Sequence, residues 1–321
     1  GLLPQLAPVL LAQALHGAAS CMLNPSIAAL TLGLVASSAV AGRLGRNAGF
    51  AAAGAAAGAI LMGAVGTWLS SRAVLFLAAG LCLPALWMLR HLAGAGQPAA
   101  APPAQVPAMT LAPSHEPWRR VLADRRLLAY LGCIVLFHFA NAAMLPLAAI
   151  EVTKRVGDDA SLVIAACILV PQIIVALLAA QVGRWAQLWG RRPILLIGFC
   201  ALPARALLLA YVDHPALIVA VQALDGLGAS AFGVMTPLIA ADLSGQGGRF
   251  NLRMGLFGLA VGLGATISTS LAGWAGTAYD SHAAFRLLTA AGQVAALTCL
   301  RRGAQPPTRP ELPVDWPDLP T

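Results

Sequence analysis

Long apolar runs alternate with short polar segments along almost the whole chain. A helix needs roughly 17–25 predominantly apolar residues to cross the hydrocarbon core of a bilayer. Nine runs have about this length, and they cover residues 6–35, 48–68, 73–90, 128–149, 160–181, 193–212, 215–239, 254–277 and 283–300. The pattern therefore predicts an all-α polytopic membrane protein with nine transmembrane helices.

The composition supports this prediction. Hydrophobic residues make up 59% of the 321 residues and charged residues only 10%, whereas about a quarter of the residues in a soluble domain are charged. The net charge of +8 does not indicate nucleic-acid binding, because the basic residues lie in short loops between apolar runs. The six cysteines lie inside apolar runs without a CxxC spacing, so we predict no metal site and no cofactor.

The basic residues are concentrated in every second connection between the predicted helices. One set of alternate connections contains fifteen of them, and the other set contains only Arg72, Lys154 and Arg155. Because cytoplasmic loops carry the excess of lysine and arginine, residues 91–127 and the C-terminal tail are predicted to be cytoplasmic. Glu151, beside Lys154 and Arg155, is expected to be solvated in an outer loop.

Two segments do not fit the pattern of spans. Residues 93–113 are rich in alanine, proline and glycine and are predicted to form a flexible linker. The stretch that follows, residues 114–128, is basic and amphipathic, and such a stretch is predicted to lie on the inner membrane surface. The tail of residues 303–321 contains six prolines and is predicted to be disordered.

The chain repeats itself with an offset near 210 residues. Gln13-Ala-Leu-His-Gly17 matches Gln222-Ala-Leu-Asp-Gly226 at an offset of 209, and further short matches follow in the same order. The second copy, residues 128–302, contains six predicted helices, whereas residues 1–90 contain three. Two parallel copies of a helical unit are typical of many transporters. The repeat therefore predicts three further helices before Gly1 and twelve spans in all, with residues 91–127 joining the two halves.

The stretch from Gly183 to Arg192 resembles a loop pattern of the major facilitator superfamily, G-x-x-x-D-x-x-G-R-[KR], in place and spacing. Its glycines, Gly183 and Gly190, would allow a tight turn and a close approach of helices. Arg191 and Arg192 could bind helix-end carbonyls and anionic lipid. Gln187 stands where the family has aspartate, so the resemblance implies gating by hydrogen bonds and not a charge relay. A basic inner loop without a mechanism is the alternative.

The resemblance covers nearly the whole chain and implies the fold of this superfamily, truncated at its N-terminus, in the plasma (inner) membrane. It also implies a secondary transporter that acts as a monomer on a small molecule, with protons as the expected coupling ion. The family often carries an arginine four residues before a glycine in the fourth helix of its first half. Gln13 and Gly17 occupy these positions, so this arginine is absent.

Two charged residues lie deep inside predicted spans. Ionisable groups at membrane depth are costly, and they mark functional sites by default. Asp225 is the one acid well inside a span, and Arg205 is the one deep arginine of the preceding helix. Counted from the connection between their helices, their depths differ by roughly 5 Å at a rise of about 1.5 Å per residue. A buried pair is therefore predicted, either as a structural ion pair or as a couple linked to transport.

Other polar residues inside the spans are further candidates. His138 and Asn141 are three residues apart on one helical face, and His16 occupies the repeat position of Asp225. Either histidine could carry a coupling proton, or could be a packed neutral residue. The amides inside the spans could line a cavity or bond helices together; they are Asn24, Gln172, Gln222 and Gln293.

Functions of other classes have weaker support. The sequence contains no HExxH, GxSxG or P-loop motif and no paired intramembrane aspartates, so no catalytic residues are predicted for a membrane-embedded enzyme. An inactive truncated membrane protein is a further alternative, because family motif positions are changed. A cavity with few charges and some amides fits a neutral or weakly amphiphilic small molecule. Export is the favoured direction, and uptake of a sugar or an organic acid is the alternative.

The predicted sidedness can be tested by labelling single-cysteine variants with a membrane-impermeant maleimide. Residues 91–127 and 303–321 are expected to react only after the membrane is permeabilised, and residues 153–159 are expected to react from outside. The reason is the concentration of fifteen basic residues in the inner connections. The reverse labelling pattern would contradict the predicted orientation.

Overall fold

The structure of the protein is a computed structural model that describes residues 6–94, 117–156, 160–244, 249–278 and 281–302. Over these residues the chain is helical and contains no strand. A short 3-10 turn covers Ser37–Ala39, and the α-helices are α1 (Leu6–Leu34), α2 (Val40–Trp68), α3 (Ser71–Gly94), α4 (Trp118–Ala123), α5 (Arg125–Asn141), α6 (Met144–Val156), α7 (Ala160–Leu188), α8 (Arg191–Tyr211), α9 (Pro215–Val221), α10 (Ala223–Ser244), α11 (Phe250–Ala278) and α12 (Ser281–Arg302).

Eight candidate spans in the described residues are long and apolar enough to cross a membrane. The helix pairs α5–α6 and α9–α10 each count as one of them. The ninth predicted span forms helix α12, which is not among the eight and carries Arg286 and Gln293. Its 22 residues would extend over about 33 Å, which is long enough for a hydrocarbon core of about 30 Å. The prediction of an all-α polytopic membrane protein is confirmed.

Several helices extend beyond the apolar runs that predict them. Helix α2 begins at Val40, so Arg43 and Arg46 lie on its first turns and not in a loop. Helix α7 continues to Leu188, so Gly183 lies within a helix. The reason is that polar and glycine residues at a span end continue the backbone hydrogen bonding after the apolar run has ended.

The described part of the basic stretch of residues 114–128 contains two helical segments. Within its described part, a short helix α4 ends at Ala123, and Asp124 then caps helix α5. The Asp124 carboxylate accepts a hydrogen bond of 2.8 Å from the backbone N–H of Arg126, and aspartate is a favoured N-cap residue. Most of the predicted linker and the whole predicted tail lie outside the described residues.

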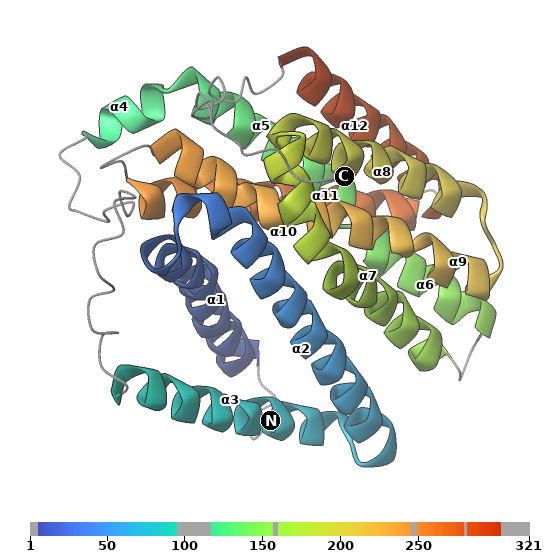
Figure 1. Cartoon of the computed structure of the whole chain (residues 1–321). Helices are drawn as coiled ribbons and strands as arrows, with labels where there is room; N and C mark the ends of the chain where they lie inside the picture. Colours follow the sequence, from blue (N-terminus) through green and yellow to red (C-terminus); the bar gives the residue numbers. More distant parts are fainter. Residues whose placement is uncertain (1–5, 95–116, 157–159, 245–248, 279–280, 303–321) are drawn as a thin grey trace, which may run out of the picture.

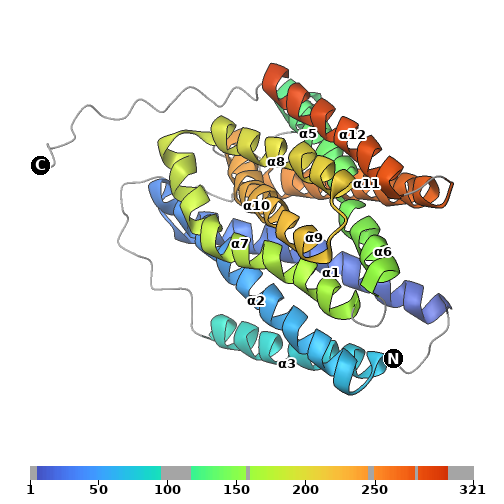
Figure 2. The same cartoon turned by 90° about the vertical axis from the view of Figure 1, so that its right-hand side faces the viewer.

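Helices α5 to α12 form one bundle, and α1 to α3 lie along one side of it (Figures 1 and 2). Helix α2 packs along α7 and makes the main contact between α1–α3 and the bundle. Helix α3 packs on α2, whereas α1 contacts α11 and α2. Within the bundle, α10 packs between α7 and α8, α11 packs on α5, and α12 packs on α8 and α5.

Small residues set the distance between α2 and α7. A Cβ added at Gly45 would overlap with the carbonyl oxygen of Ala179, and one added at Gly183 would overlap with that of Ala41. Lipid offers apolar surroundings as good as another helix does, so helices in a membrane associate through close packing of small residues. The α2–α7 crossing is therefore a backbone-to-backbone contact that a larger side chain cannot enter.

Two spans are interrupted inside the bundle, and each interruption contains a polar residue. The first break follows Asn141, where Pro146 cannot donate a hydrogen bond to Ala142 and its ring disfavours a continuous helix. The N–H of Ala143 instead donates to Ser268 Oγ at 3.1 Å. The second break is at Gln222, where the N–H bonds to Val219 O at 3.1 Å in a tighter turn.

Candidate substrate and coupling site

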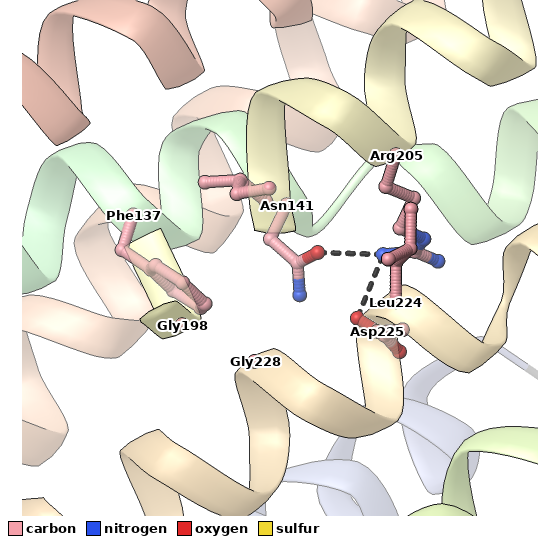
Figure 3. A pocket seen from close by; sticks show the side chains of 8 residues that line it. Phe137, Asn141, Gly198, Arg205, Leu224, Asp225 and Gly228 are labelled. Carbon is pink, nitrogen blue, oxygen red and sulfur yellow. Dashed lines mark hydrogen bonds and ion pairs between the residues drawn. The ribbon is translucent and has the colours of Figure 1, made fainter. Parts of the chain in front are cut away.

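Asn141 of α5 and Asp225 of α10, which belong to the two broken spans, meet at Arg205 of α8 (Figure 3). Arg205 Nη1 donates to Asn141 Oδ1 at 2.6 Å and to Asp225 Oδ1 at 2.7 Å. Arg205 Nη2 donates to Gln222 Oε1 at 2.5 Å. The structure thus contains the ion pair that the similar depths of Arg205 and Asp225 predict, and it adds one amide from each break.

The two charges of the pair differ in burial. The Arg205 side chain is 2% exposed, whereas the Asp225 side chain is 26% exposed. The guanidinium therefore lies behind the carboxylate, enclosed by protein. A buried charge is costly unless it is paired and hydrogen-bonded, and Asp225, Asn141 and Gln222 supply these partners to Arg205.

Glycines allow the helices that carry the pair to approach closely. A Cβ at Gly198 of α8 would lie 3.0 Å from the Cβ of Ala231 of α10. A Cβ at Gly226, the residue after Asp225, would lie 2.9 Å from the carbonyl oxygen of Pro171 in α7. Larger residues at these glycines would push α10 away from its neighbours. The close packing of α7, α8 and α10 thus places the carboxylate against the guanidinium.

A small pocket lies beside the ion pair (Figure 3). One end is polar, and the other walls are apolar or formed by glycine; the lining residues are Phe137, Asn141, Gly198, Leu202, Arg205, Leu224, Asp225 and Gly228. Ligand sites commonly combine apolar walls with a few polar groups that orient the ligand. The lining of this pocket thus combines one polar end, formed by Asn141, Arg205 and Asp225, with apolar walls.

His138 lies on α5 one turn before Asn141, close enough to Asp225 for an electrostatic interaction. Its ring centroid is 5.4 Å from that of Phe137 and 5.2 Å from that of Phe232. His138 Nε2 is buried and has no hydrogen-bond partner among the described residues. His138 is thus next to the cluster without being bonded into it.

The other predicted candidates do not join this cluster. His16 and Asn24 are exposed on α1, which packs on α11 and α2. Gln172 is half-buried on α7, and Gln293 is exposed on α12. None of these four residues lines the described pocket. Spacing within a helix predicts which residues share a face, but it does not show which faces point to the same place.

The stretch from Gly183 to Arg192 forms the end of α7, a turn and the start of α8. Gly183 lies at the contact with α2, as described above, and Gly190 has a φ of 85°, a conformation that favours glycine. Both roles predicted for the glycines are therefore present, at separate positions. Gln187 Nε2 donates to the carbonyl oxygen of Ser38, in the connection between α1 and α2.

Arg191 links the end of α7 to the end of α10. Its Nε lies 3.1 Å from Asp242 Oδ2, its Nη2 lies 3.4 Å from Asp242 Oδ1, and its Nη1 donates to Ala186 O at 3.0 Å. The predicted bond to a helix-end carbonyl is thus present, and Arg192 is exposed. Sequence reasoning missed Asp242 and Ser38. The opposite charges of Arg191 and Asp242 at the same predicted membrane side are the one signal that could have indicated their contact.

The sequence predicts a solvated Glu151 in an outer loop, and this prediction is wrong. Its side chain is only 11% exposed and bonds to Lys154 Nζ at 2.9 Å. Arg155 lies 3.7 Å from Glu151 and 2.6 Å from Asp213, in the connection between α8 and α9. Because α6 packs against α7, α9 and α12, the face of α6 that carries Glu151 and Val152 is buried, and the acid is held in a small ionic network.

The fold and the site define a polytopic helical membrane protein with a charged couple beside a pocket at membrane depth, and comparison with known proteins gives the family. The profile of the Major Facilitator Superfamily matches residues 1–180 and 131–318. Two uncharacterized MFS-type transporters, from two strains of Mycobacterium tuberculosis, are each 37% identical over 283 residues, which is 87% of this chain and 67% of theirs. No solved structure matches the chain. The chain belongs to the major facilitator superfamily, whose members are secondary transporters of small molecules.

The ion pair can be tested by unfolding variants in detergent micelles. Asp225→Asn is expected to lower the free energy of unfolding by about 3 kcal/mol, because it leaves the enclosed Arg205 without a counter-charge. The double variant Asp225→Asn with Arg205→Gln is expected to recover most of this loss.

Asp213→Asn is a matched control, because Asp213 also pairs with an arginine but is 62% exposed. Exposed pairs contribute at most about 1 kcal/mol. Equal losses for the two single variants, or a double variant less stable than Asp225→Asn alone, would contradict a buried pair.

Proposed function

We propose that this member of the superfamily is a proton-coupled transporter in which Asp225 responds to protons and substrate. The observation that carries the proposal is the unequal burial of the pair: the carboxylate of Asp225 reaches the pocket, and Arg205 lies behind it as a fixed counter-charge. A carboxylate at the pocket can exchange protons with the substrate path. Because the guanidinium is enclosed, the free energy of the site depends strongly on whether the Asp225 carboxylate is protonated.

Protonation of Asp225 would change the contacts of three spans together. A neutral Asp225 no longer balances the charge of Arg205, so the contact between α8 and α10 weakens. Asn141 and Gln222 bind the same guanidinium, and each lies at the break of a span. A ligand or a proton shifts a conformational equilibrium only through a different affinity for the two states, and this cluster provides such a difference at the breaks.

We further propose that residues 1–90 and 128–302 belong to two halves joined by a cytoplasmic linker, and that the α2–α7 crossing is a gate between them. The internal repeat and the charge bias of the loops support this division. Gly45 and Gly183 contact the opposite helix near the predicted cytoplasmic ends, and Gln187 bonds to Ser38 beside them. In this conformation the halves are thus in backbone contact on the predicted cytoplasmic side.

Export in the plasma membrane stays a prediction from the sequence, as does action as a monomer. The apolar walls and polar end of the pocket support a small substrate with one polar group. Uptake of an organic acid is a second candidate, because Arg205 is a positive group at the pocket. Proton coupling through Asp225 is compatible with both directions: exchange of the proton for the substrate would drive export, and binding of the two together would drive uptake.

The coupling role can be tested by measuring transport by the full-length protein in proteoliposomes with and without a pH gradient. The single variant Asp225→Asn, which keeps Arg205 in the site, is expected to retain exchange or downhill flux. It is expected to lose proton-driven accumulation, because the site no longer contains a carboxylate that takes up a proton. An Asp225→Asn variant that still concentrates substrate would exclude this role and leave His138 and His16 as candidates. Asp213→Asn serves as the control that retains accumulation.

The gate can be tested with two valine variants of the same helix. Gly45→Val is expected to force α2 and α7 apart, whereas Gly54→Val adds a side chain where nothing lies within 4 Å. Cys167 of α7, which is 2% exposed, is the reporter. Its reaction with N-ethylmaleimide, followed by peptide mass spectrometry, is expected to be about tenfold faster in Gly45→Val than in Gly54→Val. Equal rates with unchanged transport would contradict a gate at this crossing.

A further inference from the structure

The cluster around Arg205 contains more hydrogen-bond donors than acceptors. Arg205 Nε and Gln222 Nε2 are buried and have no hydrogen-bond partner among the described residues. Gln222 is 0% exposed and Arg205 is 1% exposed as whole residues. Buried polar groups without partners are rare and need an explanation. Both groups are donors only, so the group that would satisfy them must supply acceptor atoms.

One of the two unpartnered donors, Nε, lies on the edge of the Arg205 guanidinium that also carries Nη2. The Nε and Nη2 groups of arginine point the same way and form a fork that can bind a carboxylate with two parallel hydrogen bonds. Asp225 does not use this fork, because its Oδ1 accepts from Nη1. The fork instead faces Gln222, whose Oε1 accepts from Nη2. Gln222 thus lies on the same edge of the guanidinium as the unpartnered Nε, although it does not line the pocket in this conformation.

We propose that the substrate of this site carries a carboxylate that accepts hydrogen bonds from Arg205 Nε and Gln222 Nε2, and that one proton binds to Asp225 with it. This inference rests on the proposed coupling role of Asp225 and names the class of substrate. The apolar body of the substrate would lie against Phe137, Leu202 and Leu224, which line the same pocket as Arg205 and Asp225.

The balance of charge explains the accompanying proton. Arg205 and Asp225 together are neutral, so a substrate carboxylate would leave the site with one negative charge inside the membrane, which is costly. A proton on Asp225 restores neutrality and weakens the bond from Nη1 to its carboxyl group, while Asn141 still accepts from Nη1. Among the described residues, His138 of α5 interacts electrostatically with Asp225, and Cys167 of α7 interacts with Arg205. Neither group supplies an anion that replaces Asp225.

The test uses probes with one carbon chain and three head groups, with the full-length protein in lipid nanodiscs. Hexanoate, hexanamide and hexylamine are titrated by calorimetry at pH 6, 7 and 8. The same three head groups on four-carbon and eight-carbon chains form a shorter and a longer series. The carboxylates are expected to bind at least about tenfold tighter than the amides, because a charged acceptor strengthens each hydrogen bond.

Binding is also expected to depend on pH in one direction. Uptake of one proton for each carboxylate bound makes the affinity rise by up to about tenfold for each unit by which the pH falls. The probes themselves stay ionised above about pH 6, since carboxyl groups of this kind titrate near pH 4–5. Calorimetry in buffers of different ionisation enthalpy counts the proton directly. No proton uptake, or affinity that rises with pH, would overturn the coupled part of the proposal.

Gln222→Leu removes the amide donors and is expected to reduce the preference for carboxylate over amide about tenfold. Gln181→Leu, at a half-buried glutamine of α7 outside the cluster, is expected to leave the preference unchanged. Amides that bind as well as carboxylates, tighter binding of the amines, or no binding in any of the three series would overturn the proposal.

This result is separable from the coupling role of Asp225. Proton-driven accumulation that depends on Asp225, without preference for carboxylates, would leave the proposed function in place and remove only the substrate class. A preference for carboxylates without proton uptake, together with accumulation by Asp225→Asn, would instead remove the coupling role.

Discussion

The positive charge of Arg205 is the constraint on which the rest of the bundle depends. The guanidinium of a residue that is 1% exposed among apolar helices must be balanced and hydrogen-bonded, because a buried charge without partners is costly. The chain meets this need with a carboxylate from α10 and with amides from two further positions. Residues of α5 and of the α9–α10 span thus bind the same guanidinium, which belongs to α8. Any change in its charge acts on three spans together.

The interruptions of the two spans follow from the same need. A continuous helix satisfies its own backbone, so it presents side chains only at fixed angular positions. At the break after Asn141, Pro146 leaves the carbonyl of Ala142 without its helical donor, and Ser268 Oγ accepts from the N–H of Ala143. Irregular backbone at membrane depth is tolerated only where protein or a cavity surrounds it. The breaks are therefore enclosed by neighbouring helices, next to the pocket and not against lipid.

The site also depends on glycines at the helix contacts, which let the helices approach closely. Between helices in a membrane, close approach of the backbones replaces the hydrophobic effect as the source of association. The contact of Gly226 with Pro171 positions α10 on α7, and the contact of Gly45 with Ala179 positions α2 on α7. One helix, α7, thus takes part both in the walls around the charged couple and in the crossing with α2. A movement of α10 at the couple therefore acts on the helix that forms this crossing.

The sequence by itself was sufficient for the class of fold, the membrane spans and the pairing of Arg205 with Asp225. Apolar run length is set by the thickness of the bilayer, and two lone opposite charges at similar depth in adjacent helices have few other partners. Helix ends, the breaks at Asn141 and Gln222, and the burial of Glu151 were decided only by tertiary structure. So was the separation of His16 and Asn24 from the pocket. These features depend on which helix faces meet and how closely, and a one-dimensional pattern of apolar and polar residues does not contain that information.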